Sequence, residues 1–185
     1  MIMPKVYLAS ASPRRRELLT QIGVDFSVLS VAVDESVLSD ELPSVYVERI
    51  ALAKATAGWE SLKKDWRPVI GADTAVILPN QQILGKPQDL EQARYFLGQL
   101  SGTEHQVMSA VAIVWQHSHW LALQTSSVRF KKLTSDEIDW YLRTGEGKDK
   151  AGGYAVQGLA AMFIENINGS YSGVMGLPLF QTSQL

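Results

Sequence analysis

The segment Ser10–Arg16 combines small hydroxyl residues with a run of three arginines. A short apolar run over 6–9 precedes it and predicts a buried strand. Ser12 and Pro13 predict a helix start, because serine is a good N-cap and proline suits the first helical position. Arginines in a first helical turn are unfavourable, since the helix dipole already places positive partial charge there. The pattern favours a bound anion at this turn, and the alternative is a solvated basic helix start.

Asp73 lies inside the most apolar strand pattern of the chain, which covers residues 68–78. A carboxylate within a buried strand is costly unless it is paired or holds a metal ion. Gly71 and Ala72 leave room for a ligand to approach the backbone. The alternative is an aspartate at a strand bulge that bonds to a neighbouring loop. Because functional carboxylates are often presented to clefts in this way, we interpret Asp73 as a site residue.

Other charged residues could join such a site. Asp34 and Glu35 end a predicted strand over 26–33 and could supply a metal carboxylate, although adjacent acids are also common surface charges. Lys86 stands between glycine and proline, which suits a positioned cation. Lys54 lies among alanines of a predicted helix, where the alternative is a lysine that snorkels to the surface.

A glycine-rich stretch, Asp149–Gly158, could close over a flat ligand such as a nucleobase. Gln157 offers a donor and an acceptor that could bond the edge of a base. The alternative is a structural glycine-rich turn.

Composition limits the function classes. The 185 residues fit a single domain over 1–185. A net charge of −2 disfavours nucleic acid and anionic membranes as partners. The absence of cysteine excludes disulfides, thiolate metal sites and cysteine nucleophiles. No long apolar run follows the first residues, so we expect no signal peptide, and no stretch approaches the roughly 18 apolar residues of a membrane span. We therefore expect a cytoplasmic protein.

These candidates must be positioned by alternating helices and strands. Helices are predicted over 13–22, 43–64, 90–100 and 134–145. Strands are predicted over 6–9, 26–33, 68–78, 83–84, 106–115, 120–130 and 162–167. The order and the hairpin over 106–130 predict an α/β domain with a mixed, twisted sheet and flanking helices.

Taken together, the motifs resemble those of the Maf family, in the family's order and over essentially the whole chain. They are Leu8–Arg15, Gly71–Thr74, Gly85–Pro87, Lys150–Tyr154 and Gly176–Leu179. Maf proteins are nucleoside triphosphate pyrophosphatases, once described as septum formation inhibitors. The resemblance implies two lobes around a cleft, a fold similar to the inosine triphosphate pyrophosphatases, and cleavage between the α- and β-phosphates.

The resemblance also implies roles for individual residues. Asp73 matches the family's proposed general base, and Glu35 matches a carboxylate implicated, with Asp73, in binding Mg²⁺ or Mn²⁺. The positions that match phosphate contacts are Ser10, Arg14, Arg15, Lys54 and Lys86. The subgroup acting on dTTP and UTP carries specificity residues that match Arg14, Thr74 and Gln157 here, whereas the subgroup acting on 7-methyl-GTP differs at all three.

Two other functions fit the same motifs: a nucleotide-binding regulator of septum formation with little turnover, and a housekeeping enzyme of broad nucleotide preference. Asp73 and Glu35 favour hydrolysis, because a pure binder gains nothing from acids near a triphosphate unless a metal ion intervenes. The resemblance further suggests a homodimer.

Overall fold

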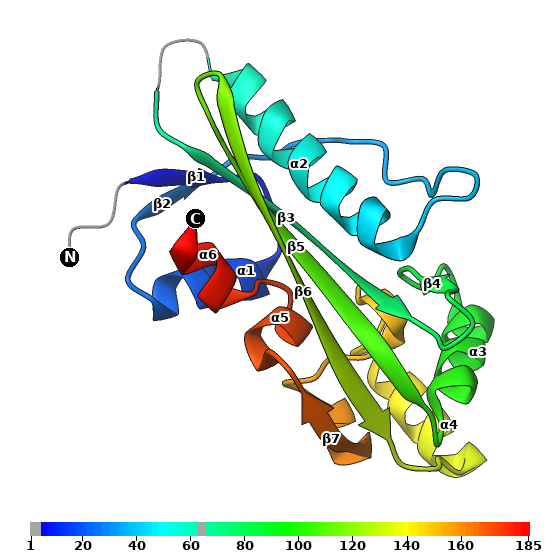
Figure 1. Cartoon of the computed structure of the whole chain (residues 1–185). Coiled ribbons are helices and arrows are strands. Elements are labelled where there is room, and N and C mark those ends of the chain that lie inside the picture. The colour runs from blue at the N-terminus through cyan, green and yellow to red at the C-terminus, as the bar shows by residue number, and fades with distance from the viewer. Residues whose placement is uncertain (1–4, 63–65) are drawn as a thin grey trace.

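The computed structural model describes residues 5–62 and 66–185 (Figure 1). Within these residues, seven strands form one mixed sheet in the order β2-β1-β3-β5-β6-β7, with β4 paired to β3. Strands β1, β2 and β3 are parallel, and the remaining pairs are antiparallel. The strands are β1 Val6–Leu8, β2 Phe26–Val28, β3 Val69–Ile77, β4 Ile83–Leu84, β5 Glu104–Trp115, β6 Ser118–Phe130 and β7 Ile164–Asn168.

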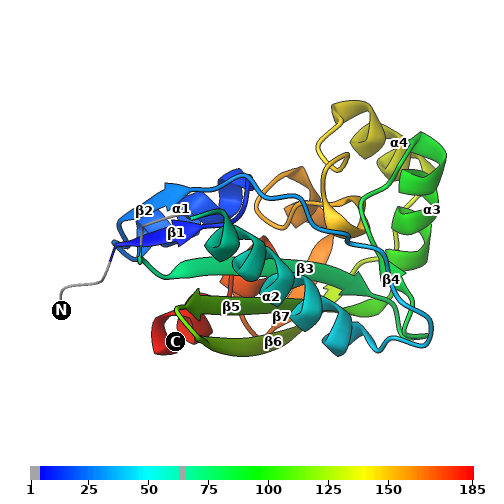
Figure 2. The same ribbon diagram turned by 90° about the horizontal axis from the view of Figure 1, so that it is seen from above.

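Helices cover both faces of this sheet, which confirms the predicted mixed α/β architecture. Helix α2 packs on one face, and α1 and α5 pack on the other (Figure 1). Figure 2 shows α1 with β1 and β2 at one end of the molecule and α3 with α4 at the other. Among the helices of the described ranges, none combines the length and the apolar character that a transmembrane span requires. The helices are α1 Pro13–Gln21, α2 Pro43–Ser61, α3 Leu90–Leu100, α4 Ser135–Thr144, α5 Tyr171–Met175 and α6 Leu179–Gln184, with 3₁₀ turns at Ala151–Gly153 and Leu159–Phe163.

One edge of β3 is interrupted. Strand β1 pairs with Val69 and Ile70, and β4 pairs with Val76 and Ile77. Both must lie on the same side, because β5 pairs with the whole of β3 on the other side. Residues 71–75 therefore have no strand partner on that side among the described residues, and the sheet contains a gap next to Asp73.

The alternation of side chains along β3 sends neighbouring residues to opposite faces. Asp73 faces α2, where Ala75 and Ile77 also pack. Thr74 lies opposite Ser109 on the other face, toward α5. The gap connects the two faces of the sheet beside residues 71–75 of β3. Asp73 and Thr74 can therefore both reach it, although their side chains lie on opposite faces.

Several predicted helix boundaries are confirmed by their caps. Asp89 accepts a hydrogen bond from the Gln92 backbone at the start of α3. Thr134 and Glu137 form the predicted capping box of α4, and Gly23, with φ of 75°, follows α1. Helix α2 ends at Ser61, and the predicted end near Lys64 falls outside the described residues.

Four strand predictions are wrong in extent by two residues or more. The strands predicted from 106 and 120 begin two residues earlier, at 104 and 118. The predicted strand over 26–33 stops at Val28, because its partner β1 has three residues and the chain then turns into the Ser10–Arg16 segment. Glu35 therefore lies in a loop and does not end a strand. The strand predicted over 162–167 begins at Ile164, since the preceding residues form a 3₁₀ turn.

Gly71 serves helix packing, which corrects the prediction that it admits a ligand. A Cβ at this position would lie 2.3 Å from the Ala51 carbonyl oxygen and 2.5 Å from the Ala55 nitrogen, both in the backbone of α2. We expect Gly71→Ala to lower the free energy of unfolding by about 1–3 kcal/mol, the usual range for overpacking. The cause is that the backbone of α2 must move to make room for the added methyl group. Urea unfolding measures this, with Gly98→Ala as the control, since nothing lies within 4 Å of a Cβ there.

His105 is a buried histidine, 1% exposed, that shares a hydrogen bond of 2.8 Å between its Nε2 and the Tyr154 hydroxyl. Burial lowers the pKa of His105 to about 4. The unfolded chain, with an ordinary histidine pKa of about 6.5, therefore takes up a proton first as the pH falls. This residue's contribution to stability is complete above pH 6.5 and is lost between there and pH 4. We expect the loss between pH 7 and pH 5 to be about 2 kcal/mol.

The measurement is urea unfolding of the wild type and His105→Gln at both pH values. We expect the variant to lose about 2 kcal/mol less than the wild type over this pH interval. An equal loss in the two proteins would mean that another group carries the acid sensitivity.

Candidate active site

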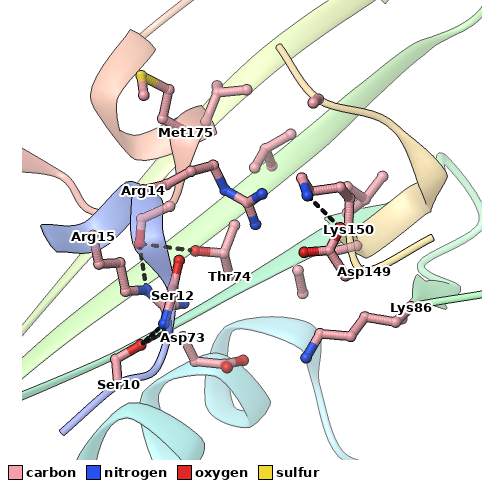
Figure 3. Close-up of a pocket in the computed structure, with 18 of the residues that line it drawn as sticks. Ser10, Ser12, Arg14, Arg15, Asp73, Thr74, Lys86, Asp149, Lys150 and Met175 are labelled. Atoms are coloured by element: carbon pink, nitrogen blue, oxygen red, sulfur yellow. Dashed lines mark hydrogen bonds and ion pairs between the residues drawn. The ribbon is translucent and has the colours of Figure 1, made fainter. Parts of the chain in front are cut away.

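A cleft of about 400 Å³ opens at the gap in β3. Its walls come from distant parts of the chain: the turn after β1, helix α2, the loop before it, the segment after β4, the loop around 149–157 and the end of α5 (Figure 3). All the residues predicted for the site line this cleft. They are Ser10, Arg14, Arg15, Glu35, Lys54, Asp73, Thr74, Lys86 and Gln157.

Asp73 and Glu35 are joined by a lysine. The Lys54 ammonium lies 2.8 Å from Asp73 Oδ1 and 2.8 Å from Glu35 Oε1. Asp73 is 6% exposed, and the side chains of Lys54 and Glu35 are 12% and 46% exposed. The lysine therefore compensates the charge of the buried aspartate and fixes the two carboxylates around one point. The other oxygen of each carboxylate has no hydrogen-bond partner among the described residues.

The field at Glu35 is positive overall. Burial pushes its pKa up, but the hydrogen bond and charge of Lys54, with the charges of Lys86 and Arg15, hold the pKa below its ordinary value. Lys86 is exposed and extends into the cleft from the segment after β4 (Figure 3). Glu35 is thus an anion at neutral pH, surrounded by cations.

Ser10, which is buried, and Arg15, which is partly buried, brace the turn after β1. Ser10 Oγ accepts hydrogen bonds from the Ser12 backbone (3.2 Å) and from Arg15 Nη1 (3.1 Å). Arg15 Nε donates to the Gly176 carbonyl at 2.9 Å. Since a hydroxyl has two acceptor sites and one hydrogen, Ser10 is left able to donate. A residue that can only donate is suited to an anionic oxygen.

The start of α1 differs from expectation in the hydrogen bonding of Ser12. Ser12 occupies the N-cap position, but its side chain accepts no bond from α1, so the predicted cap is incomplete. Arg14 reaches into the cleft (Figure 3). Burial lowers its pKa, and the charge of Asp149 opposes this. An arginine remains cationic at neutral pH in such surroundings.

Thr74 belongs to a chain of hydroxyl groups. Its Oγ1 lies 2.8 Å from Ser109 Oγ, and the Ser109 hydroxyl donates to the Gly173 carbonyl at 2.6 Å. Ser109 has one hydrogen, so the hydrogen shared with Thr74 comes from Thr74. The same Thr74 hydrogen is also within reach of the Gly176 carbonyl, to which Oγ1 donates at 3.3 Å. Its remaining capacity toward a ligand is to accept.

The glycine-rich loop contains a structural turn and also contributes side chains to the cleft, so both interpretations of its sequence apply. Gly152 has φ of 67°, and its amide donates to the Gly85 carbonyl at 3.0 Å, so this glycine is structural. The same loop carries Asp149 and Lys150, an ion pair in the cleft wall (Figure 3). Gln157 is exposed at the cleft, where it can reach a ligand.

Sequence reasoning missed Tyr46 and Ser109. Tyr46 lines the cleft eight residues before Lys54, a spacing that places both on one ridge of α2 and could have indicated it. Burial, with the charges of Asp73 and Glu35, raises the pKa of Tyr46 to about 12. No sequence signal identifies Ser109, because its role depends on the register that places it opposite Thr74.

Comparison with known proteins assigns the chain to a family. The family model for "Maf-like protein" matches residues 5–185. The chain belongs to the Maf-like protein family. This confirms the resemblance inferred from the motifs.

Two relatives in this family are each named dTTP/UTP pyrophosphatase. The protein of Alkalilimnicola ehrlichii is 52% identical, over 98% of this chain and 91% of its own. The protein of Pectobacterium atrosepticum is 51% identical, over 99% of this chain and 92% of its own. Among solved structures, the Staphylococcus aureus Ham1 protein aligns with a TM-score of 0.50 and 16% identity, over 68% of this chain and 71% of that chain. At that identity the likeness concerns the fold alone.

Proposed function

We propose that this Maf-like protein hydrolyses dTTP and UTP to the monophosphate and pyrophosphate, for housekeeping of the nucleotide pool. The observation that carries the proposal is the pair of carboxylates bridged by Lys54 at the gap in β3, facing Ser10 and the cleft arginines. The names of the relatives at 52% and 51% identity support the same substrates.

The cations of the cleft would hold the triphosphate. Arg14 and Lys86 extend into the cleft from different segments, and Ser10 is left as a donor. Arg15 is braced by Ser10 and Gly176, so we assign it to the rigid end of the phosphate site. Cations fixed before the substrate arrives stabilise the charge that develops on phosphate oxygens.

Asp73 is the proposed general base. Its carboxylate is buried and held by Lys54, with one oxygen left for a water molecule. In this position it would orient and deprotonate the water that attacks the α-phosphorus in line with the leaving pyrophosphate. Lys54 keeps the carboxylate in place and balances its charge.

Glu35 and Asp73 fit a divalent ion as a pair. Hard oxygen ligands suit Mg²⁺ or Mn²⁺, and Mg²⁺ commonly binds through one or two carboxylates together with substrate phosphates. The described residues contain no group of three or more acidic or histidine side chains that could hold a metal without substrate. We therefore propose that Glu35 and Asp73 hold the ion with the nucleotide. When bound, such an ion neutralises phosphate charge and activates water.

Base specificity is assigned to Arg14, Thr74 and Gln157. The edge of uracil or thymine presents two carbonyl oxygens around one N–H group. Arg14 and Gln157 can donate to the carbonyl oxygens, and the Thr74 oxygen is left to accept from the N–H. Cytosine has an acceptor where uracil has the N–H, so it would meet the Thr74 oxygen unfavourably.

The test is a panel of common and modified nucleoside triphosphates with Mg²⁺ or Mn²⁺, with products resolved by ion chromatography. We expect pyrophosphate as the first product, released from dTTP and UTP faster than from purine triphosphates or CTP. Orthophosphate as the first product would contradict the mechanism. Binding without turnover of any nucleotide would favour the alternative, a nucleotide-binding regulator of septum formation.

The surroundings of the protein follow from this function. We propose a cytoplasmic location, where nucleotide pools are held, and a small-molecule substrate; the net charge of −2 supports the absence of a nucleic-acid partner. A homodimer stays a prediction of the family resemblance. Size-exclusion chromatography with light scattering measures it.

A further inference from the structure

Residues 29–42, which carry Glu35, form neither helix nor strand. Helix α2 holds this segment by its backbone at two adjacent carbonyls. The Tyr46 hydroxyl donates to the Glu35 carbonyl at 3.0 Å, and Arg49 Nη2 donates to the Ser36 carbonyl at 2.9 Å.

Further hydrogen bonds outside the cleft lining tie the segment to α2 and to itself. Arg49 makes two hydrogen bonds to the Glu41 carboxylate, of 2.6 and 2.7 Å. The Ser36 amide donates to Asp34 Oδ1 at 2.9 Å, and the Leu38 amide donates to Glu41 Oε2 at 3.0 Å. Arg49 thus anchors the base of the segment, and Tyr46 is the cleft residue that holds its Glu35 end.

We propose that Tyr46 is a positioning residue that fixes Glu35 in the cleft through its hydroxyl group. Glu35 lies on a loop, and its side chain is 46% exposed. The ion pair with Lys54 holds one end of this side chain, the carboxylate, and leaves the backbone end to be fixed by another contact. Tyr46 holds the main chain of the same residue from the same helix, eight residues earlier. Two attachments, one to the backbone and one to the carboxylate, set both the place and the direction of the side chain. The inference rests on the proposed role of Glu35 in turnover.

Direct participation of Tyr46 in phosphate binding is disfavoured by its hydrogen bond. A phenol has one hydrogen, and here it is donated to the Glu35 carbonyl. The hydroxyl is left with acceptor sites, which do not suit an anionic phosphate. Its effect on the reaction must therefore pass through Glu35.

The first experiment is kinetic and uses Tyr46→Phe, which keeps the ring and removes the hydroxyl. We expect kcat for UTP to fall about 10–100-fold, the usual effect of losing a group that orients a metal-binding side chain. The Mg²⁺ concentration at half-maximal rate should rise while the KM for UTP changes little. The control is Tyr95→Phe, which removes the hydroxyl of a half-exposed tyrosine outside the cleft and should match the wild type.

A double-mutant cycle with Glu35→Gln separates positioning from an independent role. If Tyr46 acts through Glu35, the double variant falls no further than Glu35→Gln alone. Losses that multiply would overturn the inference. If Glu35→Gln alone retains full activity, the proposed role of Glu35 fails, and the structural readout below decides the placement by Tyr46.

Hydrogen exchange measured by mass spectrometry gives that readout without turnover. Peptides over 29–42 contain the amides of Ser36 and Leu38, which are protected by bonds inside the segment. We expect faster exchange in Tyr46→Phe than in the wild type or Tyr95→Phe. Unchanged exchange in Tyr46→Phe would overturn the inference whatever the activity shows.

Discussion

Asp73→Asn is expected to lower kcat for UTP and dTTP by about 10²–10⁴-fold, the usual contribution of a general base. The amide is nearly isosteric with the carboxylate, but it cannot take a proton from water. Because it still accepts a hydrogen bond, it can keep contact with Lys54, now 2.8 Å from Asp73. Nucleotide binding should therefore remain measurable by calorimetry, while steady-state pyrophosphate release is nearly lost.

Asp25→Asn is the matched control. Asp25 also pairs with a lysine, Lys5, but its side chain is 64% exposed and lies outside the cleft. This variant should keep wild-type kinetics. Normal turnover in Asp73→Asn would remove Asp73 from the centre of the mechanism. Loss of both turnover and nucleotide binding would indicate that the carboxylate organises the whole site.

Lys54→Met is expected to damage both stability and turnover. The methionine keeps the apolar stem but leaves Asp73, 6% exposed, without its counter-charge. Removing one partner of a buried pair costs about 3–5 kcal/mol, and we expect the lower end because Glu35 is half-exposed. Loss of a fixed cation should lower kcat/KM about 10²-fold or more.

The stability loss should depend on pH with a definite sign. In the wild type, burial raises the pKa of Glu35, but Lys54 and its neighbours hold it below the ordinary value. That contribution is present above the ordinary glutamate pKa and disappears as the pH falls through the lowered one. The difference between wild type and Lys54→Met should therefore be larger at pH 7 than at pH 4 in urea unfolding.

Lys5→Met removes the exposed lysine of the Lys5–Asp25 pair and serves as the control for Lys54→Met. Exposed pairs contribute about 0–1 kcal/mol, so little change is expected. Equal losses in the two variants would show that burial of the Lys54 pair has no special importance.

The sequence indicated the main parts of this structure where the information is local. The caps at Asp89 and Thr134 are confirmed because capping depends on a few adjacent residues. Asp73 stood out because a carboxylate in an apolar strand requires compensation. The family resemblance then gathered residues that local patterns left ambiguous, such as Lys54 and Lys86, and the structure places them in one cleft.

What the sequence could not indicate depends on contacts between distant segments. The strand predicted to reach residue 33 ends at Val28 because its neighbour β1 is short. Gly71 looked like space for a ligand, although α2 fills that space. Ser109 acquires its role from strand register and has no local signature. Tyr46 shares a ridge of α2 with Lys54, but its bond to the Glu35 carbonyl depends on a loop whose path the sequence does not give.

The interrupted edge of β3 has a consequence for how this enzyme family can diversify. The span between Ile70 and Val76 is fixed by backbone pairing with β1 and β4, and six residue steps of strand measure about 20 Å. The length of the gap along β3 is therefore set by the hydrogen-bond register of β1 and β4. We expect substitutions at Arg14, Thr74 or Gln157, the proposed specificity residues, to change which base is preferred and to leave this gap unchanged. Because the gap is flanked by paired strands at both ends, a small ligand can enter it, whereas an extended strand of another protein cannot dock along it.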